Sequence, residues 1–177
     1  MDHTKKNILE LTRCTLKQYT ATEKKPLAVL LDNVRSAYNV GAIFRTADAF
    51  LLEKIILTGI TGYPPNPEIK KTALGAEESV AWTYEKNALE AVKNLKKEGW
   101  KVCVLEQAHG SLPLQDFRGN ENEKYVLVAG NEVEGVNQQI VDMADIVLEI
   151  PQYGIKHSLN VSVSVGIALW QMIKFRL

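Results

Sequence analysis

The chain has 177 residues, which is enough for one domain with a substantial hydrophobic core. Its composition, 46% hydrophobic and 24% charged, is typical of a soluble globular protein and excludes a collagen-like or low-complexity chain. The 21 basic side chains balance the 21 acidic ones, so no overall positive field indicates a nucleic-acid partner; only a local basic patch would.

The N-terminal residues 1–25 are locally basic, with six basic and three acidic side chains. Ile8, Leu11 and Leu16 recur near helical spacing and predict a short amphipathic helix. Two interpretations stay open, a solvated helix that closes the fold and a helix that faces RNA. We expect this segment to be a basic helical extension that precedes a single domain at residues 26–177.

Cys14 and Cys103 lie far apart in the sequence, without the spacing of a metal site, and are expected to be free thiols. The polar, basic N-terminus does not resemble a signal peptide. No apolar run approaches the length of a membrane span. These features predict a cytoplasmic protein with no membrane partner.

Short apolar runs predict the strands, at residues 27–32, 54–58, 80–84, 101–105, 125–129 and 146–150. Helices are predicted between them, starting with one that Asn39 caps and continuing at residues 68–74, 87–98 and 138–143. Three prolines within residues 62–67 require a loop. This alternation favours one α/β domain, a mainly parallel sheet flanked by helices.

The segment 160–165 is ambiguous. Its sequence Asn-Val-Ser-Val-Ser-Val alternates polar and apolar residues, which periodicity assigns to a strand. The apolar residues that follow fit a helix better, so the residues themselves favour a helix only slightly.

Three polar loops, at residues 33–45, 130–136 and 152–160, follow predicted strands or surround a helix start. Ligands of parallel α/β sheets bind beyond the carboxyl ends of the strands, where such loops gather. Neither the glycine-rich dinucleotide fingerprint nor the phosphate-binding Gly-Lys-Ser/Thr motif is present. The loops therefore indicate either a different ligand or, for residues 152–160, an ordinary connection into the core.

Residues 39–45 (Asn-Val-Gly-Ala-Ile-Phe-Arg), 130–135 (Gly-Asn-Glu-Val-Glu-Gly) and 150–163 (Ile-Pro through Ser-Leu-Asn-Val-Ser-Val) resemble motifs one, two and three of the SpoU/TrmH family. That family is the RNA ribose 2′-O-methyltransferase branch of the SPOUT superfamily. All three motifs occur in order, across roughly residues 26–170.

The resemblance implies a SPOUT-type domain with a C-terminal deep trefoil knot, and a helix from Asn160 onwards. It also implies S-adenosylmethionine as methyl donor, no metal, and a homodimer whose site uses both chains. The implied partner is RNA, with a tRNA guanosine ribose as the preferred acceptor and rRNA as the second.

The resemblance assigns catalytic roles to Arg45, Asn39, Glu132, Ser158 and Asn160. A guanidinium is effectively never deprotonated, so we expect Arg45 to bind an RNA phosphate and stabilise the developing alkoxide rather than act as a base. Asn39 is expected to orient Arg45 or cap a helix, and Glu132 to hold Arg45 or a substrate amide. Ser158 is expected to bond phosphate or ribose, and Asn160 to cap the last helix.

Further positions are expected to contact the methyl donor or the RNA. Those for the donor, the first three largely through backbone atoms, are Gly130, Ile150, Leu159, Leu105, Glu106 and Gln107. Those for RNA, as a local basic patch and a loop histidine, are Arg35, Lys70, Lys71, Lys156 and His157. His157 is also an alternative base, because an unperturbed histidine titrates near neutrality.

Two other classes of protein remain as alternatives. One is a non-catalytic RNA-binding protein that keeps the knotted scaffold, which loss of Arg45 or Ser158 would have favoured; both residues are present. The other is a small-molecule methyltransferase or other α/β enzyme, which fits the sheet but not the third motif.

Overall fold

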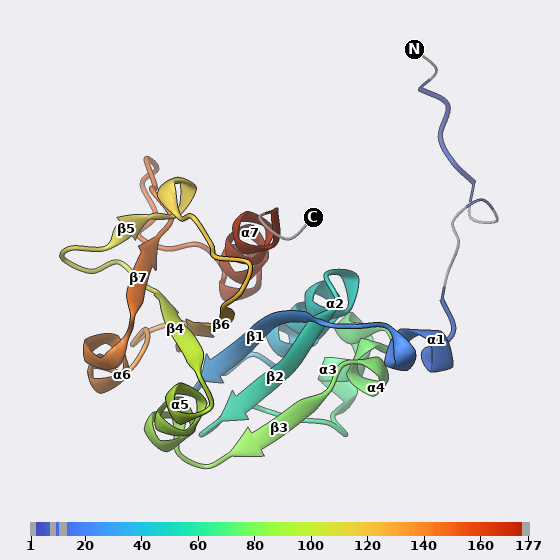
Figure 1. Ribbon diagram of the computed structural model, residues 1–177, viewed down its shortest axis with the longest axis horizontal. Helices are drawn as coiled ribbons and strands as arrows, with labels where there is room; N and C mark the ends of the chain where they lie inside the picture. Colours follow the sequence, from blue (N-terminus) through green and yellow to red (C-terminus); the bar gives the residue numbers. More distant parts are fainter. Residues whose placement is uncertain (1–2, 8–9, 11–13, 175–177) are drawn as a thin grey trace.

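The computed structural model describes residues 3–7, 10 and 14–174. Its framework is a parallel sheet of seven strands in the order β3-β2-β1-β6-β4-β7-β5 (Figure 1). The strands are β1 Lys25–Asp32, β2 Leu52–Thr58, β3 Trp82–Glu85, β4 Trp100–Leu105, β5 Leu112–Pro113, β6 Lys124–Ala129 and β7 Ile146–Glu149. The predicted α/β class with a mainly parallel sheet is confirmed.

Strand β1 lies in the interior of the sheet, between β2 and β6. Val29 of β1 is in register with Ile55 on one side and with Leu127 on the other. Residues 27–32 are all buried, because helices cover both faces of the sheet. Such burial explains why these strands appear in the sequence as continuous apolar runs rather than alternating ones.

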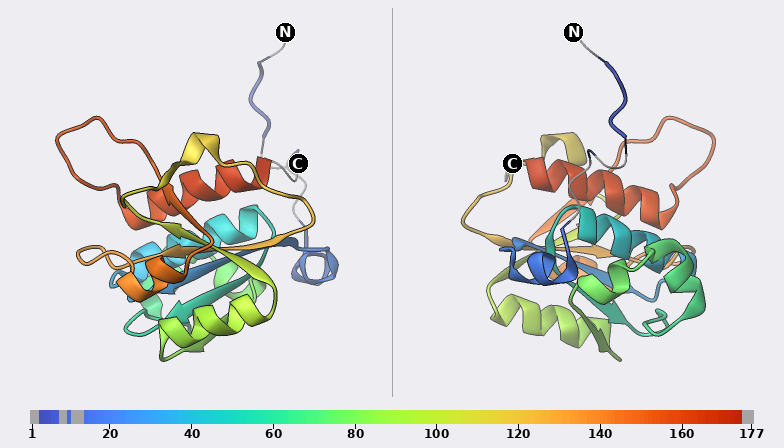
Figure 2. Two further views of the ribbon diagram at one scale, coloured as in Figure 1. Left: turned by 60° about the vertical axis from the view of Figure 1, so that its left-hand side comes forward. Right: turned by 90° about the vertical axis from the view of Figure 1, so that its right-hand side faces the viewer.

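The helices form a layer on each face of the sheet (Figure 2). One face packs against a cluster that includes Phe44 and Leu169, and the other against a cluster that includes Leu95 and Ile140. The first layer contains α2 Ala37–Ala49, α3 Pro67–Ala73, α4 Ala76–Ser79 and α7 Val161–Ile173. The second contains α5 Ala88–Lys97 and α6 Gln138–Met143.

The N-terminal helix is shorter than the amphipathic pattern suggested. Helix α1 covers Leu16–Ala21, contacts α4, and has Tyr19 as its buried residue, whereas Leu16 is exposed. Ile8 and Leu11 lie outside the described residues. Cys14 and Cys103 are free thiols, as predicted, and burial raises the pKa of the Cys103 thiol to about 12.

Three details of the predicted elements are corrected. Ser36, not Asn39, caps α2, because its hydroxyl accepts from the Asn39 N–H at 3.3 Å. The strand predicted at 80–84 begins at Trp82, because the preceding residues form α4 and Val80 is its C-cap. The short β5 and the 3-10 helix Leu114–Asp116 carry no periodic signal and were not predicted.

The ambiguous segment is a helix: α7 begins directly after Asn160, whose side-chain oxygen accepts from Ser162 N at 2.9 Å. This capping bond satisfies backbone donors that a strand would have paired with a neighbour. None of the helices in the described ranges is both long and apolar enough to cross a membrane.

Candidate active site

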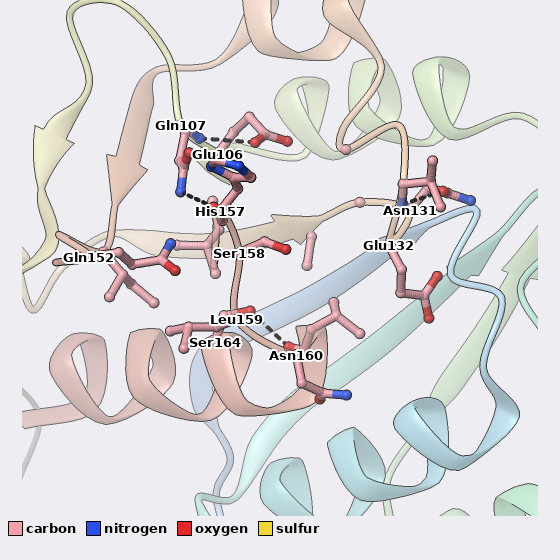
Figure 3. A pocket seen from close by; sticks show the side chains of 17 residues that line it. Glu106, Gln107, Asn131, Glu132, Gln152, His157, Ser158, Leu159, Asn160 and Ser164 are labelled. Atoms are coloured by element: carbon pink, nitrogen blue, oxygen red, sulfur yellow. Dashed lines mark hydrogen bonds between the residues drawn. The ribbon is translucent and has the colours of Figure 1, made fainter. Parts of the chain in front are cut away.

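An open cavity of about 530 Å³ lies beyond the carboxyl ends of β4, β6 and β7 (Figure 3). Its size is within the range of small-molecule sites, and its position is where parallel sheets bind ligands. The wall mixes apolar side chains with convergent polar groups from the loops after all three strands. The lining residues are Leu105, Glu106, Gln107, Ala129, Gly130, Asn131, Glu132, Val133, Gly135, Ile150, Gln152, His157, Ser158, Leu159, Asn160, Val161 and Ser164.

The motif-two loop forms one wall of this cavity and is closed on itself. Asn131 and Gly135 exchange two backbone hydrogen bonds of 3.0 Å, and the Asn131 side-chain oxygen accepts from Val133 N at 2.9 Å. A side chain at Gly130 would collide with the backbone of Gly135 and Val136. The loop can pack this tightly only because residue 130 has no Cβ.

Glu106, at the end of β4, fastens the motif-two loop from the other side. Its carboxylate accepts from Val136 N at 3.0 Å and from Gln107 N at 2.9 Å. The Gln107 side chain then donates to the His157 carbonyl at 2.8 Å, so the loop that follows β7 is fastened as well. These two neighbours therefore connect all three walls of the cavity (Figure 3).

A second set of hydrogen bonds connects the three predicted motifs. The Glu132 carboxylate of motif two accepts from Arg35 N at 2.9 Å, from Ser36 N at 3.1 Å and from the Asn39 amide at 3.2 Å. Asn39 accepts in turn from the Asn160 amide at 3.1 Å. The start of α2, the motif-two loop and the start of α7 are thus held together by three side chains.

The electrostatics of Glu132 follow from this arrangement. Partial burial acts to raise the pKa of its carboxyl, but the hydrogen bonds from Arg35 N, Ser36 N and the Asn39 amide outweigh it and hold that pKa below the ordinary value. The carboxylate has its donors already, which suits an orienting group better than a proton acceptor.

The structure brings most of the predicted catalytic residues together and leaves one out. Glu132, Ser158 and Asn160 line the cavity, and Asn39 is bonded to two of these three. Arg45 lies further along α2, is exposed, and lines a separate shallow hollow beside Lys71. Within the described part of a single chain, Arg45 therefore does not contribute to the cavity.

The predicted ligand-contacting residues divide in the same way. All six predicted for the methyl donor line the cavity. Of the five predicted for RNA, only His157 does so. The other four are exposed: Arg35 follows β1, Lys70 and Lys71 lie on α3, and Lys156 lies in the loop after β7.

Seven lining residues were not singled out as site residues from the sequence, and three of them carry polar side chains, namely Asn131, Gln152 and Ser164. Asn131 stands inside motif two, between two residues that were predicted, so its position was a usable signal. Gln152 begins the polar loop at 152–160 inside motif three, so it had a similar signal, whereas Ser164 directly follows that motif and had none. Among the residues that the structure describes, no group of three or more His, Cys, Asp or Glu side chains could hold a metal ion.

Comparison with known proteins matches residues 26–170 to the model of the SpoU rRNA methylase family. A 23S rRNA (guanosine-2′-O-)-methyltransferase of Ralstonia nicotianae is 32% identical over 155 residues, which are 87% of this chain and 61% of that protein. A tRNA (guanosine(18)-2′-O)-methyltransferase of Aquifex aeolicus is 31% identical over 170 residues, 93% of this chain and 76% of that protein. The chain thus spans less than two thirds of the Ralstonia relative.

Solved structures agree with these sequence matches. The TrmH/SpoU tRNA modifying enzyme of A. aeolicus superposes with a TM-score of 0.80 at 29% identity, covering 91% of this chain and 82% of that one. The AdoMet-bound rRNA methyltransferase of Sinorhizobium meliloti superposes with a TM-score of 0.81 at 29% identity, covering 88% and 58%. Motifs two and three line one cavity, motif one is bonded to both through Asn39, and this chain belongs to the SpoU rRNA methylase family.

Proposed function

We propose that the chain is an S-adenosylmethionine-dependent methyltransferase that modifies an RNA ribose 2′-hydroxyl, with a tRNA guanosine as the first acceptor to test and rRNA as the second. The observation that carries this proposal is the connection of all three motifs by Glu132, Asn39 and Asn160 at the edge of one cavity. The names of the Ralstonia and Aquifex relatives support the acceptor class.

The cavity suits the methyl donor. Leu105, Ile150 and Leu159 offer an apolar wall for an adenine ring, and the polar ends of Glu106 and Gln107 stand beside it. Gly130 lets the motif-two loop pack closely against the backbone of Gly135 and Val136, which shapes this wall of the cavity. When bound, the donor supplies the electrophilic methyl group; the residues of this chain bind and orient it.

The remaining residues are assigned by position. Ser158, which lines the cavity, would hydrogen-bond the acceptor ribose or its phosphate. Glu132 and Asn160 orient the walls through Asn39 rather than take a proton. Arg45 would bind phosphate and stabilise the developing alkoxide, because a guanidinium keeps its charge throughout the reaction. Placing the two reactants in line supplies much of the rate enhancement.

We infer that Arg45 reaches the cavity from a second copy of the chain. Helix α7 exposes Val163, Ile167 and Trp170, which follow one another at helical spacing on one face and are 50%, 43% and 57% exposed. This apolar stripe supports an isologous homodimer, in which α7 and the neighbouring α2 of one copy pack against the same helices of the other.

Several finer features stay part of the proposal. We infer a catalytic domain at residues 26–177 with a basic extension at 1–25, and a trefoil knot formed by the C-terminal segment. The cytoplasmic location also remains a prediction; it fits an enzyme that meets tRNA or rRNA there.

The decisive experiment compares ribose 2′-O-methylation across total RNA from cells with and without the gene. We expect one or a few sites to be lost, and purified protein with labelled S-adenosylmethionine to restore them. An identical methylation map from the two strains, despite normal expression, would contradict the catalytic proposal under those conditions.

Calorimetry separates the catalytic proposal from the alternative of a non-catalytic RNA-binding protein. An enzyme binds S-adenosylmethionine in the cavity, whereas the alternative requires only RNA. Folded protein that binds RNA but takes up no S-adenosylmethionine would favour the alternative. RNA affinity that does not fall with salt would instead argue against phosphate contacts.

A further inference from the structure

Three aromatic side chains gather at the edge of the sheet, outside the cavity. We call Tyr63, Trp82 and Tyr84 the aromatic platform. The centroid of the Tyr63 ring lies 4.6 Å from that of Tyr84, at an interplanar angle of 41°. It lies 6.3 Å from the centroid of Trp82, at an interplanar angle of 28°. Tyr63 is 48% exposed and Tyr84 39%, so a ligand can reach both side chains. Trp82 and Tyr84 belong to β3, the edge strand (Figure 1).

The platform is held in place before any ligand arrives. The Tyr84 hydroxyl donates to the Gly59 carbonyl at 2.8 Å, which fastens the edge strand to the loop that carries Tyr63. That loop runs through Pro64 and Pro65, whose rings restrict the backbone, and Asn66 ends it by capping α3. A ligand that stacks here loses little additional conformational freedom in the protein.

Hydrogen bonds join the platform to the wall of the cavity. Asn131, which lines the cavity, donates from its side chain to the Asn33 carbonyl at 2.9 Å. The Asn33 side chain accepts from Ile60 N at 3.0 Å, at the start of the loop that carries Tyr63. Because β2 and β1 separate β3 from β6, the platform lies roughly 15 Å from the cavity, at about 4.8 Å per strand.

A basic residue, Arg35, lies between the aromatic platform and the cavity. Arg35 follows β1, its backbone N–H donates to Glu132, and its side chain is exposed. In the part of the chain that the structure describes, the Arg35 guanidinium has no ion pair or hydrogen bond. Guanidinium groups bind phosphate well.

We propose that the aromatic platform stacks an unpaired base that flanks the target nucleotide, while Arg35 binds a phosphate between platform and cavity. This inference rests on the proposed function, since it assigns the substrate contacts of that enzyme. Stacking on a ring face accepts any base, and loops or single strands are where RNA bases are free to stack. The substrate region is therefore an unpaired segment, recognised here without reading base identity.

Two variants of one residue test the platform. Tyr63→Leu keeps an apolar side chain but removes the ring, whereas Tyr63→Phe keeps the ring. The probe is a single-stranded RNA of about twelve nucleotides that carries a fluorescent purine analogue, used without methyl donor. We expect Tyr63→Leu to raise the Kd about tenfold and Tyr63→Phe to leave it unchanged. Both should bind S-adenosylmethionine like the wild type.

The salt dependence of RNA affinity distinguishes the contribution of the Tyr63 ring from that of the Arg35 guanidinium. Tyr63→Leu should weaken RNA binding by the same factor at every salt concentration, because stacking releases no counterions. Arg35→Gln should lower the salt slope by about one, as expected for one lost phosphate contact.

If Tyr63→Leu binds the RNA probe with the same Kd as the wild type, the proposed stacking on the platform is wrong, even if the protein methylates RNA. A changed oligomeric state of Tyr63→Leu in sedimentation would assign this face to a second copy and also overturn it. Failure of the wild type to bind S-adenosylmethionine counts instead against the proposed function, because the RNA measurements use no methyl donor.

Discussion

The Asn160 side-chain amide donates to the Asn39 side-chain oxygen at 3.1 Å, although 121 residues separate them. Each amide is held in one orientation. The Asn39 nitrogen faces the Glu132 carboxylate, and the Asn160 oxygen accepts from the first N–H groups of α7. The bond therefore sets the start of α7, where Ser158 and Leu159 enter the cavity, relative to α2.

The first prediction concerns the hydrogen bond that the Asn39 side-chain amide donates to the Glu132 carboxylate. Asn39→Asp keeps the shape of the side chain but places a carboxylate opposite Glu132, where a donor is required. We expect the free energy of unfolding to fall by about 1–3 kcal/mol, and the melting temperature by about 2–4 °C for each kcal/mol. Affinity for S-adenosylmethionine should fall as well, because repulsion between the two carboxylates displaces Glu132 and with it the motif-two loop, one wall of the cavity. Thermal unfolding and calorimetry measure the two effects.

The control for this prediction is a compensating change. Glu132→Gln supplies an amide that can donate to the new carboxylate, so the double variant should be more stable than Asn39→Asp alone. Double-variant analysis measures this coupling. If the double variant loses as much free energy of unfolding as the two single variants together, residues 39 and 132 do not interact as described.

The second prediction concerns acid stability. The pKa of Glu132 is lowered in the folded protein, so its stabilising contribution is complete above the ordinary value of 4.5 and is lost as the pH falls through the lower folded value. The difference in unfolding free energy between the wild type and Glu132→Gln should therefore be constant near neutrality and shrink below 4.5.

Urea unfolding between about pH 7 and about pH 3 measures this difference. Glu134→Gln is the matched control, since it removes an exposed carboxylate of the same loop that accepts none of these hydrogen bonds. A difference for Glu132→Gln that stays constant down to the lowest pH would show that its hydrogen bonds do not favour the charged form.

The sequence predicted the framework because the framework depends on local patterns. The runs 27–31 and 125–129 are apolar throughout, which is typical of strands covered on both faces, and they lie side by side in the middle of the sheet. Helix α5 was predicted from its amphipathic pattern at residues 87–98; it covers Ala88–Lys97, and Asn87 is its N-cap. The motif residues that line the cavity followed from resemblance to a known family.

The parts that were not predicted depend on contacts between distant residues. Ser36 and Asn39 are both good capping residues, and the choice between them follows from Glu132, which binds the N–H of Ser36 and the side chain of Asn39. The position of Arg45 outside the cavity depends on how α2 packs, which periodicity does not determine. Helix α4 has only four residues, too few for a periodic signal.

The third prediction concerns the close packing of the motif-two loop. In Gly130→Ala the new methyl group would meet backbone atoms of Gly135 and Val136, which cannot move aside as a side-chain end can. We expect the loop to open and affinity for S-adenosylmethionine to fall more than about tenfold, a loss of about 1.4 kcal/mol or more. Gly154→Ala is the matched control, because no atom lies within 4 Å of its Cβ. Equal affinities of the two variants would contradict this account of Gly130.

The last prediction tests whether Arg45 acts across a dimer. Arg45→Ala should abolish most methyl transfer but leave S-adenosylmethionine affinity and stability unchanged, because the side chain is exposed and lies outside the cavity. The informative measurement mixes this variant with Gly130→Ala at limiting S-adenosylmethionine, where Gly130→Ala should lose most of its activity for a different reason. Neither variant alone provides both an intact cavity and an arginine.

If Arg45 completes the cavity of the partner, each mixed dimer contains one site with an intact cavity from one copy and an intact Arg45 from the other. Random exchange makes about half of the dimers mixed, so activity should recover to roughly a quarter of the wild-type value. If Arg45 serves the cavity of its own chain, every site in the mixture lacks one component and no activity returns. The mixture contains the same side chains in both cases. Recovery of activity therefore depends only on whether Arg45 completes the cavity of its own chain or that of its partner.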